Sequence, residues 1–211
     1  MKKRNLELYL HIPFCVRKCN YCHFFSASGT PKEQADYVSA MVQEIQSYQE
    51  LSGEYEVQTI FLGGGTPSLL TPEQIEKIFT TIYHIFSVNE NAEITMEMNP
   101  GTVDIEKLRA MKAAGVNRLS IGLQSAQNEE LKMLGRIHTY EEFLETWKLT
   151  EQAGFKNRNI DLMSALPGQT MESYEDTLSK VLALEPEHIS AYSLILEEGT
   201  VFYDWYEKGK L

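Results

Sequence analysis

A regular alternation of short apolar runs with longer amphipathic segments constrains the fold of this chain more than any other feature. The apolar runs have the length and composition of buried strands, and turn residues bound them. The segments between them place apolar residues at helical spacing, so the sequence predicts repeated βα units. Strands are expected at residues 6–12, 57–63, 93–98, 117–123, 159–166 and 187–194.

Helices are expected in the intervening segments, and local signals mark several of their ends. Thr71 precedes Pro72 and Glu73, an order typical of an N-cap followed by a proline in the first helical turn. Gly115 and Gly154 stand where the C-caps of two helices are expected. The expected helices cover residues 32–50, 72–86, 104–114, 127–134, 140–153 and 171–184, and a further candidate begins at Val201.

Repeated βα units favour a parallel sheet that either curls into a barrel or opens into a doubly wound sheet. Six units suit an α/β fold of the incomplete barrel type, a partial (β/α)6 TIM-type barrel. No linker-like or low-complexity segment divides the chain, so residues 1–211 are expected to form one domain. The chain stops soon after Val201 without a closing strand, and we expect a truncated protein.

The composition excludes several classes of protein. No apolar run approaches the roughly 20 residues needed to span a bilayer, so membrane insertion is not expected. The first residues lack the cleavage site of a secretion signal, and a cytoplasmic location is expected. A formal net charge of -11 disfavours nucleic acid as a partner, because phosphate binding depends on clustered Lys and Arg.

The only cysteines, Cys15, Cys19 and Cys22, form a C-x3-C-x2-C pattern directly after the first expected strand. An odd number of thiols in a reducing compartment argues against a disulfide framework. Three local thiolates suit a [4Fe-4S] cluster, in which one iron then stays open to a ligand from outside the protein. S-adenosylmethionine (SAM) would fill that position in this interpretation. A zinc site completed by His23, or coincidence, is the alternative.

Polar residues at the carboxyl ends of the other strands are candidate ligand contacts, because active sites of parallel barrels lie there. Residues 63–66, Gly-Gly-Gly-Thr, either admit a ligand close to the backbone or form a tight turn. Glu97 can accept both hydroxyls of a ribose, and Gln124 ends the fourth strand. Asp161 lies inside an apolar strand and needs a strong partner, either Arg136 or the donor groups of a ligand.

The histidines do not form a metal-binding pattern. His11 shares a strand face with Tyr9, and a buried structural role is favoured over ligand binding. The other histidines are interpreted as surface or local hydrogen-bonding residues: His23, His84, His138 and His188.

The cysteine loop resembles that of the radical SAM superfamily, in which an aromatic residue such as Tyr21 also precedes the last cysteine. The segment YLHIPFC, residues 9–15, resembles the opening of the oxygen-independent coproporphyrinogen III oxidase-like family. The phrases IFLGGGTPSLL, ITMEMNPGT, GVNRLSIGLQS, LGRIH and DLMSALPGQT extend the resemblance over essentially the whole chain.

This resemblance implies a radical SAM barrel with a cluster on the three cysteines and SAM as second cofactor. It places the methionyl part of SAM against Gly64, Gly65 and Thr66, and the SAM ribose on Glu97. A second SAM-sized ligand, or the substrate, is expected on the remaining side of the pocket. Tyr9 is implied to lie nearer the first SAM, and Gln124, Arg136 and Asp161 to lie on the far side; Tyr21 is a further implied cofactor contact.

The second residue after the cluster motif, Phe24, separates two branches of that family. The oxidase branch carries a fourth cysteine at the place of Phe24, whereas Cys22-His-Phe-Phe resembles the haem-chaperone (HemW-type) branch, which usually has Asp at the place of His23. The resemblance therefore implies a protein that binds haem and transfers it to apo-haem proteins. Oxidative decarboxylation of coproporphyrinogen III is the alternative, so enzymatic activity stays open.

Some partners cannot be assigned from the sequence. The haem recipient and the electron donor are not identified by any motif. The family's carboxyl-terminal domain, with a motif of His, Asn and Trp, has no counterpart before Leu211, so no haem-binding residue is named.

Overall fold

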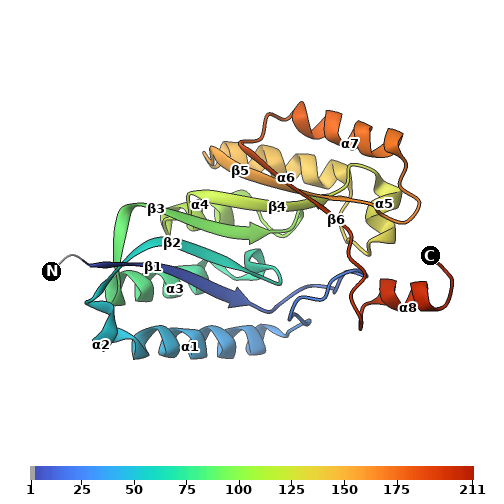
Figure 1. The fold of residues 1–211 in the computed structure, drawn as a ribbon. Helices are drawn as coiled ribbons and strands as arrows, with labels where there is room; N and C mark the ends of the chain where they lie inside the picture. The colour runs from blue at the N-terminus through green and yellow to red at the C-terminus, as the bar shows by residue number, and fades with distance from the viewer. Residues whose placement is uncertain (1–2) are drawn as a thin grey trace.

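The structure, a computed structural model, describes residues 3–211. Six parallel strands form one sheet in the order in which they occur along the chain (Figure 1). The sheet is curled, so its strands form part of a barrel. The strands are β1 (Arg4–Ile12), β2 (Tyr55–Gly64), β3 (Ser87–Met98), β4 (Arg118–Gln124), β5 (Asn157–Ser164) and β6 (His188–Ser193).

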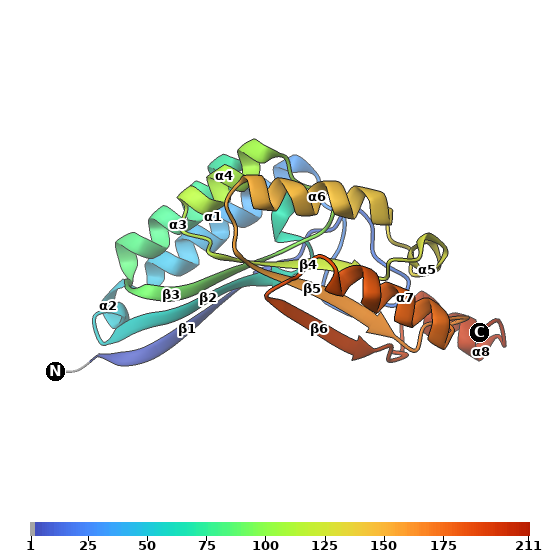
Figure 2. The ribbon, with the colours of Figure 1, turned by 90° about the horizontal axis from the view of Figure 1, so that it is seen from above.

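Helices lie on the convex face of the sheet, where Figure 2 shows α1, α3, α4 and α6 side by side. Each connects two neighbouring strands, as expected of right-handed βα units. The helices are α1 (Pro31–Ser47), α2 (Gln49–Ser52), α3 (Pro72–Ile85), α4 (Ile105–Ala113), α5 (Asn128–Met133), α6 (Tyr140–Gln152), α7 (Met171–Leu182) and α8 (Val201–Glu207), and a 3-10 turn, η1, covers Pro67–Leu69.

The core lies between the convex face of the sheet and these helices. Ile60 and Leu62 of β2 are fully buried there, against residues such as Ile78 of α3. The intervening residues of β2 point to the concave face and are only partly buried. The period-two pattern of each strand therefore separates an apolar outer face from a more polar inner face.

The expected partial (β/α)6 barrel is confirmed, and the doubly wound alternative is not found. The helix expected at Val201 is present, and Thr71 caps α3 with a capping box. Gly115 and Gly154 follow α4 and α6 with positive φ angles of 103° and 81°. No helix within residues 3–211 has the length and hydropathy of a membrane span.

The largest departure from the expected boundaries is in β3, which begins at Ser87 and not at residue 93. Most of the additional residues are polar, but Ser87 and Val88 pair with Glu56 and Val57 of β2. Pairing with a neighbouring strand makes this segment a strand although its own sequence carries little apolar signal.

Candidate functional site

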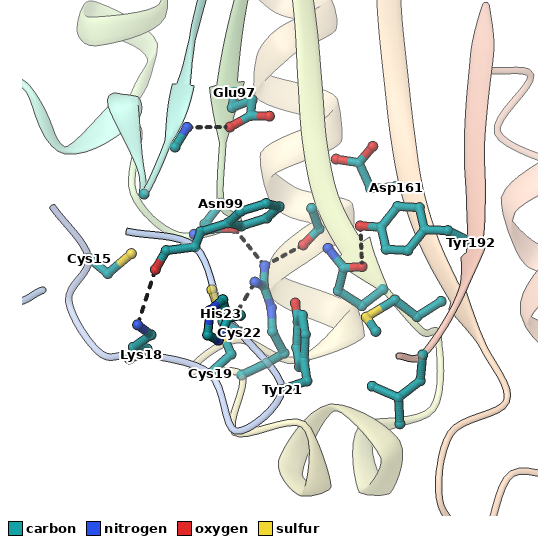
Figure 3. Close-up of a pocket in the computed structure, with 18 of the residues that line it drawn as sticks. Cys15, Lys18, Cys19, Tyr21, Cys22, His23, Glu97, Asn99, Asp161 and Tyr192 are labelled. Atoms are coloured by element: carbon teal, nitrogen blue, oxygen red, sulfur yellow. Dashed lines mark hydrogen bonds between the residues drawn. The ribbon is translucent and has the colours of Figure 1, made fainter. Parts of the chain in front are cut away.

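A cavity of about 430 Å³ opens at the carboxyl ends of the strands. The cysteine loop forms one wall, and residues from the ends of β2, β3, β4, β5 and β6 form the rest (Figure 3). Its volume falls in the range typical of small-molecule sites.

The three cysteines lie in the loop between β1 and α1, are partly exposed free thiols, and all line this cavity. A backbone hydrogen bond from Cys15 N to Ala27 O (3.0 Å) closes the loop on itself, and one from Asn20 N to Leu134 O (2.9 Å) joins it to the segment after α5. The motif is therefore held both within the loop and from outside it.

Two side chains donate hydrogen bonds to the sulfur atoms. Thr66 Oγ1 lies 3.6 Å from Cys15 Sγ, and Arg136 Nη1 lies 3.7 Å from Cys19 Sγ. Burial raises the pKa of the Cys22 thiol, with a smaller contribution from the neighbouring Cys19. Within residues 3–211, no three His, Cys, Asp or Glu side chains gather closely enough to hold a single metal ion.

Gly64 and Gly65, at the end of β2, line the cavity, but packing within the chain requires a glycine at position 65. A Cβ on Gly65 would lie 2.7 Å from the carbonyl oxygen of Phe14 and 2.8 Å from that of Ile12. Gly65 N donates to Ile12 O at 2.8 Å, and Thr66 N donates to Phe14 O at 2.7 Å. The sequence suggested that the glycines let a ligand come close to the backbone. At Gly65, it is the start of the cysteine loop that comes close instead.

Glu97 lies near the end of β3 and faces the cavity. Its Oε2 accepts a hydrogen bond from Gly64 N at 3.0 Å, which leaves further acceptor capacity for a ligand. Burial raises the pKa of this carboxyl, and the Gly64 hydrogen bond partly opposes that effect. The Glu97 carboxylate thus lines the cavity with one hydrogen bond to the backbone of β2.

Gln124 and Arg136 form the floor of the cavity. Gln124 follows an irregularity in the β4–β5 pairing and has a φ of 74°, an uncommon value for a residue other than glycine. Its Oε1 accepts a hydrogen bond from Tyr192 Oη at 3.2 Å. Arg136 Nη2 donates to Asn99 Oδ1 at 2.6 Å and to the carbonyl oxygen of Gly122.

Asp161 does not form the ion pair with Arg136 that the sequence left open. Its carboxylate accepts hydrogen bonds from Asn159 Nδ2 at 2.7 Å and from Ser120 Oγ at 3.2 and 3.3 Å. Neutral donors from β4 and β5 thus satisfy the buried carboxylate, which also lines the cavity.

Of the remaining expected contacts, one lines the cavity and two do not. Tyr21 lines the cavity, and burial raises the pKa of its hydroxyl. Thr66 is buried beneath the cysteine loop and is absent from the lining of the main cavity, where Tyr9 is absent as well. Tyr9 is 60% exposed on the concave face, where its hydroxyl is hydrogen-bonded to His11 Nδ1 at 3.0 Å.

The structure assigns the histidines roles that differ in part from those expected. His11 is partly buried and hydrogen-bonded, its Nε2 lying 2.8 Å from the carbonyl oxygen of Phe25. His138 is buried, not at the surface, and neither of its ring nitrogens has a hydrogen-bond partner among residues 3–211. Its interpretation as a surface or hydrogen-bonding residue is therefore wrong. Burial and the charge of Arg136 lower the pKa of His138 to about 3.

Polar residues of the site that the sequence analysis missed include Asn99, Ser120, Asn159 and Tyr192. Three of them lie in strands: Ser120 is four residues from Gln124, Asn159 two from Asp161, and Tyr192 four from His188. An even spacing places both residues of each pair on the inner face of the sheet. The period-two pattern could have found these three, and Asn99 follows β3 directly, at the edge where sites are expected.

A curled parallel half-barrel, with three cysteines facing a cavity at the carboxyl ends of its strands, defines an α/β-barrel protein with a candidate site at that edge. The family model of the radical SAM superfamily matches residues 9–181. This chain belongs to the radical SAM superfamily.

The relatives and solved structures similar to this chain include haem chaperones and a coproporphyrinogen III oxidase. The chain is 38% identical to the heme chaperone HemW of Bacillus subtilis over 204 residues, covering 96% of this chain and 54% of that protein. It is 41% identical to HemW of Escherichia coli over 198 residues, covering 93% and 52%. The solved structure of coproporphyrinogen III oxidase (HemN) from Escherichia coli, described as a radical SAM enzyme, matches with a TM-score of 0.88 and 32% identity, covering 97% of this chain and 47% of that one. The chain spans about half the length of the curated relatives it matches.

Proposed function

We propose that this chain holds a [4Fe-4S] cluster on Cys15, Cys19 and Cys22 and binds SAM in the adjoining cavity. The observation that carries the proposal is that all three thiols line one cavity together with the carboxylates of Glu97 and Asp161. A cubane cluster places each thiolate on a different iron, so it does not require the three sulfur atoms to meet at one ion. When bound, the cluster and SAM supply one-electron radical chemistry.

The residues around the cysteines prepare the site for a charged cofactor. Thr66 donates a hydrogen bond to the sulfur atom of Cys15, and Arg136 donates one to the sulfur atom of Cys19. Glu97 is suited to accept hydroxyl hydrogens of the SAM ribose, and Gly64 and Gly65 expose backbone to the cavity. Gln124, Arg136 and Asp161 lie toward a second ligand or the substrate in this proposal, and Tyr21 is a further cofactor contact.

We further propose that the protein acts in haem transfer, binding haem and delivering it to apo-haem proteins. Two observations support this: the two curated relatives compared are heme chaperones, and Phe24 occupies the place of the fourth cysteine of the oxidase branch. Oxygen-independent oxidation of coproporphyrinogen III is the alternative, favoured by the similarity to HemN. An electron donor, an apo-haem recipient and a cytoplasmic location are part of the proposal.

The cofactor proposal is tested by anaerobic reconstitution of the chain with iron and sulfide, followed by electron paramagnetic resonance of the reduced protein with and without SAM. The expected result is a [4Fe-4S] signal that changes when SAM is added. Cys19→Ala is expected to lose the signal. A SAM-responsive cluster that still assembles in Cys19→Ala would show that the ligand assignment is wrong.

The haem proposal is tested separately, by titrating the reconstituted chain with haem and by assaying it with coproporphyrinogen III. Haem uptake without turnover supports the chaperone proposal. Turnover of coproporphyrinogen III would favour the oxidase instead.

A further inference from the structure

A row of polar side chains crosses three neighbouring strands beneath the cavity. Ser120 of β4 pairs with Asn159 of β5, which pairs with His188 of β6. Asp161 lies two residues beyond Asn159 and therefore on the same face of β5, one step nearer the cavity (Figure 3). Asn159 is 1% exposed, so each of its polar atoms needs a partner within the protein.

The hydrogen bonds of Asn159 determine the orientation of its amide. Ser190 Oγ donates to Asn159 Oδ1 at 3.1 Å, and His188 Nδ1 contacts the same oxygen. Asn159 Nδ2 donates to Ser120 Oγ and to Asp161 Oδ1, each at 2.7 Å. A flipped amide would place its oxygen against the carboxylate, an acceptor against an acceptor. The amide therefore has one favourable orientation, with both N–H groups used.

The carboxylate of Asp161 depends on these neutral donors. Burial raises the pKa of Asp161, and hydrogen bonds from Asn159, Ser120 and Ser190 lower it, with a smaller contribution from the charge of Arg118. No Lys or Arg forms a salt bridge with Asp161 among residues 3–211. Without the donors, a partly buried carboxylate would bind a proton at a higher pH.

We propose that Asn159, whose amide Ser190 orients, is a positioning residue that together with Ser120 holds the Asp161 carboxylate ionised and aimed at the cavity to accept hydrogen bonds from hydroxyl or amine groups of a nucleoside ligand. This rests on the proposed binding of SAM in that cavity. Asp161 makes the contact with the ligand, and Asn159 acts through Asp161.

Other titratable groups also surround Asp161, and the test has to separate their effects from its own. They are Glu97 on β3, Arg118 on β4, Arg136 at the floor of the cavity, and His188 and Tyr192 on β6. Asp161→Asn removes the one group that the proposal concerns and leaves all the others in place.

The experiment measures the affinity for SAM of the reconstituted chain between pH 5.5 and pH 8.5. Asn159→Leu is expected to weaken binding about tenfold at pH 7, the effect of losing one hydrogen bond to a charged group. Its affinity is also expected to fall at a higher pH than that of the unsubstituted chain, because Asp161 then binds a proton more easily. Ser120→Ala, a smaller change, is expected to shift the profile in the same direction.

Two controls separate positioning from a merely structural role. In an Asp161→Asn background, Asn159→Leu is expected to leave the pH profile unchanged, because no carboxylate remains there to titrate. Asn117→Leu removes another amide, which accepts from Ile94 N at 2.9 Å and donates to Ala92 O at 2.7 Å outside the cavity. It is expected to lower stability without shifting the profile.

The outcomes distinguish this inference from the proposed function. If SAM binds but neither Asn159→Leu nor Ser120→Ala moves the pH profile, the positioning role is wrong while SAM binding stands. If Asn159→Leu does not fold, the Ser120→Ala profile decides. If the unsubstituted chain binds no SAM at any pH, the proposed function fails, and the inference fails with it.

Discussion

At the scale of single residues, the consecutive glycines at the end of β2, Gly64 and Gly65, serve different purposes. Gly64 has a φ of 110°, which side chains rarely tolerate, and its N–H donates to Glu97. Gly65 is required because the backbone of residues 12–14 passes too close for a Cβ. The cysteine loop and the Glu97 carboxylate are thus positioned by adjacent backbone groups.

Gly65→Ala is expected to destabilise the chain by about 1–3 kcal/mol, because backbone atoms cannot move aside as a side chain can. It is also expected to reduce cluster assembly, since the start of the cysteine loop must shift. Thermal unfolding and the absorbance of the reconstituted cluster measure the two effects.

Gly53→Ala is the matched control for this change. Gly53 has a φ of -61°, and a Cβ there would meet no atom within 4 Å. Its substitution is expected to leave both measurements nearly unchanged. Equal behaviour of the two variants would contradict the packing argument for Gly65.

The buried His138 is expected to make stability depend on pH. Its folded-state pKa of about 3 lies below the ordinary value, so the unfolded chain binds the proton first as the pH falls. The stability is fully present above pH 6.5 and is lost as the pH falls from there toward 3. Between pH 7 and pH 5 the loss amounts to about 2 kcal/mol.

His138→Phe is expected to remove this pH-dependent part. Urea unfolding under reducing conditions gives the free energy of unfolding of the variant and of the unsubstituted chain at pH 7 and at pH 5. The test is whether the difference between the two proteins changes from one pH to the other. Because the comparison uses that change, the effect of the larger ring on packing cancels. A difference that stays constant would show that His138 titrates normally in the folded state.

At the scale of elements, the ends of the helices follow from local chemistry. Thr71 accepts a hydrogen bond from Gln74 N, and the Gln74 side chain accepts one from Thr71 N at 2.9 Å. Both partners lie within four residues, so the start of α3 could be predicted. The irregular pairing of β4 with β5 near Gln124 could not, because it depends on a neighbour more than thirty residues away.

Thr71→Ala is expected to lower the free energy of unfolding by about 1 kcal/mol, the usual effect of losing an N-cap. Cluster assembly should not change, since α3 lies on the convex face, away from the cavity. Thr71→Ser keeps the capping oxygen and should restore most of the stability. Denaturant unfolding of the three proteins tests this, and equal losses in Ala and Ser variants would speak against capping.

At the scale of the whole molecule, the half-barrel leaves strand edges and apolar side chains accessible. Within residues 3–211, β6 pairs with β5 alone, and most of its residues are exposed. Phe24 and Phe25 of the cysteine loop are 70% and 82% exposed, and Ile195 is 69% exposed. An unpaired strand edge beside apolar side chains favours association between chains.

The 211-residue chain is therefore expected to self-associate as its concentration rises. Ala191→Lys places a charge on exposed β6 and should shift the population toward monomer. Sedimentation velocity over a range of concentrations measures the self-association of the unsubstituted chain and of the Ala191→Lys variant. A monodisperse monomer in the unsubstituted chain would be the contrary result.

The sequence alone determined the number and order of the βα units and the cysteine motif, and it singled out several of the residues that line the cavity. These are short-range properties: periodicity, capping and ligand spacing are all encoded within a few neighbouring residues. The tertiary structure decided that Asp161 binds Asn159 and Ser120 and not Arg136, that Thr66 lies beneath the cysteine loop, and that Gly65 is needed for packing. Those partners come together through strand register and loop packing, which join residues far apart in the sequence.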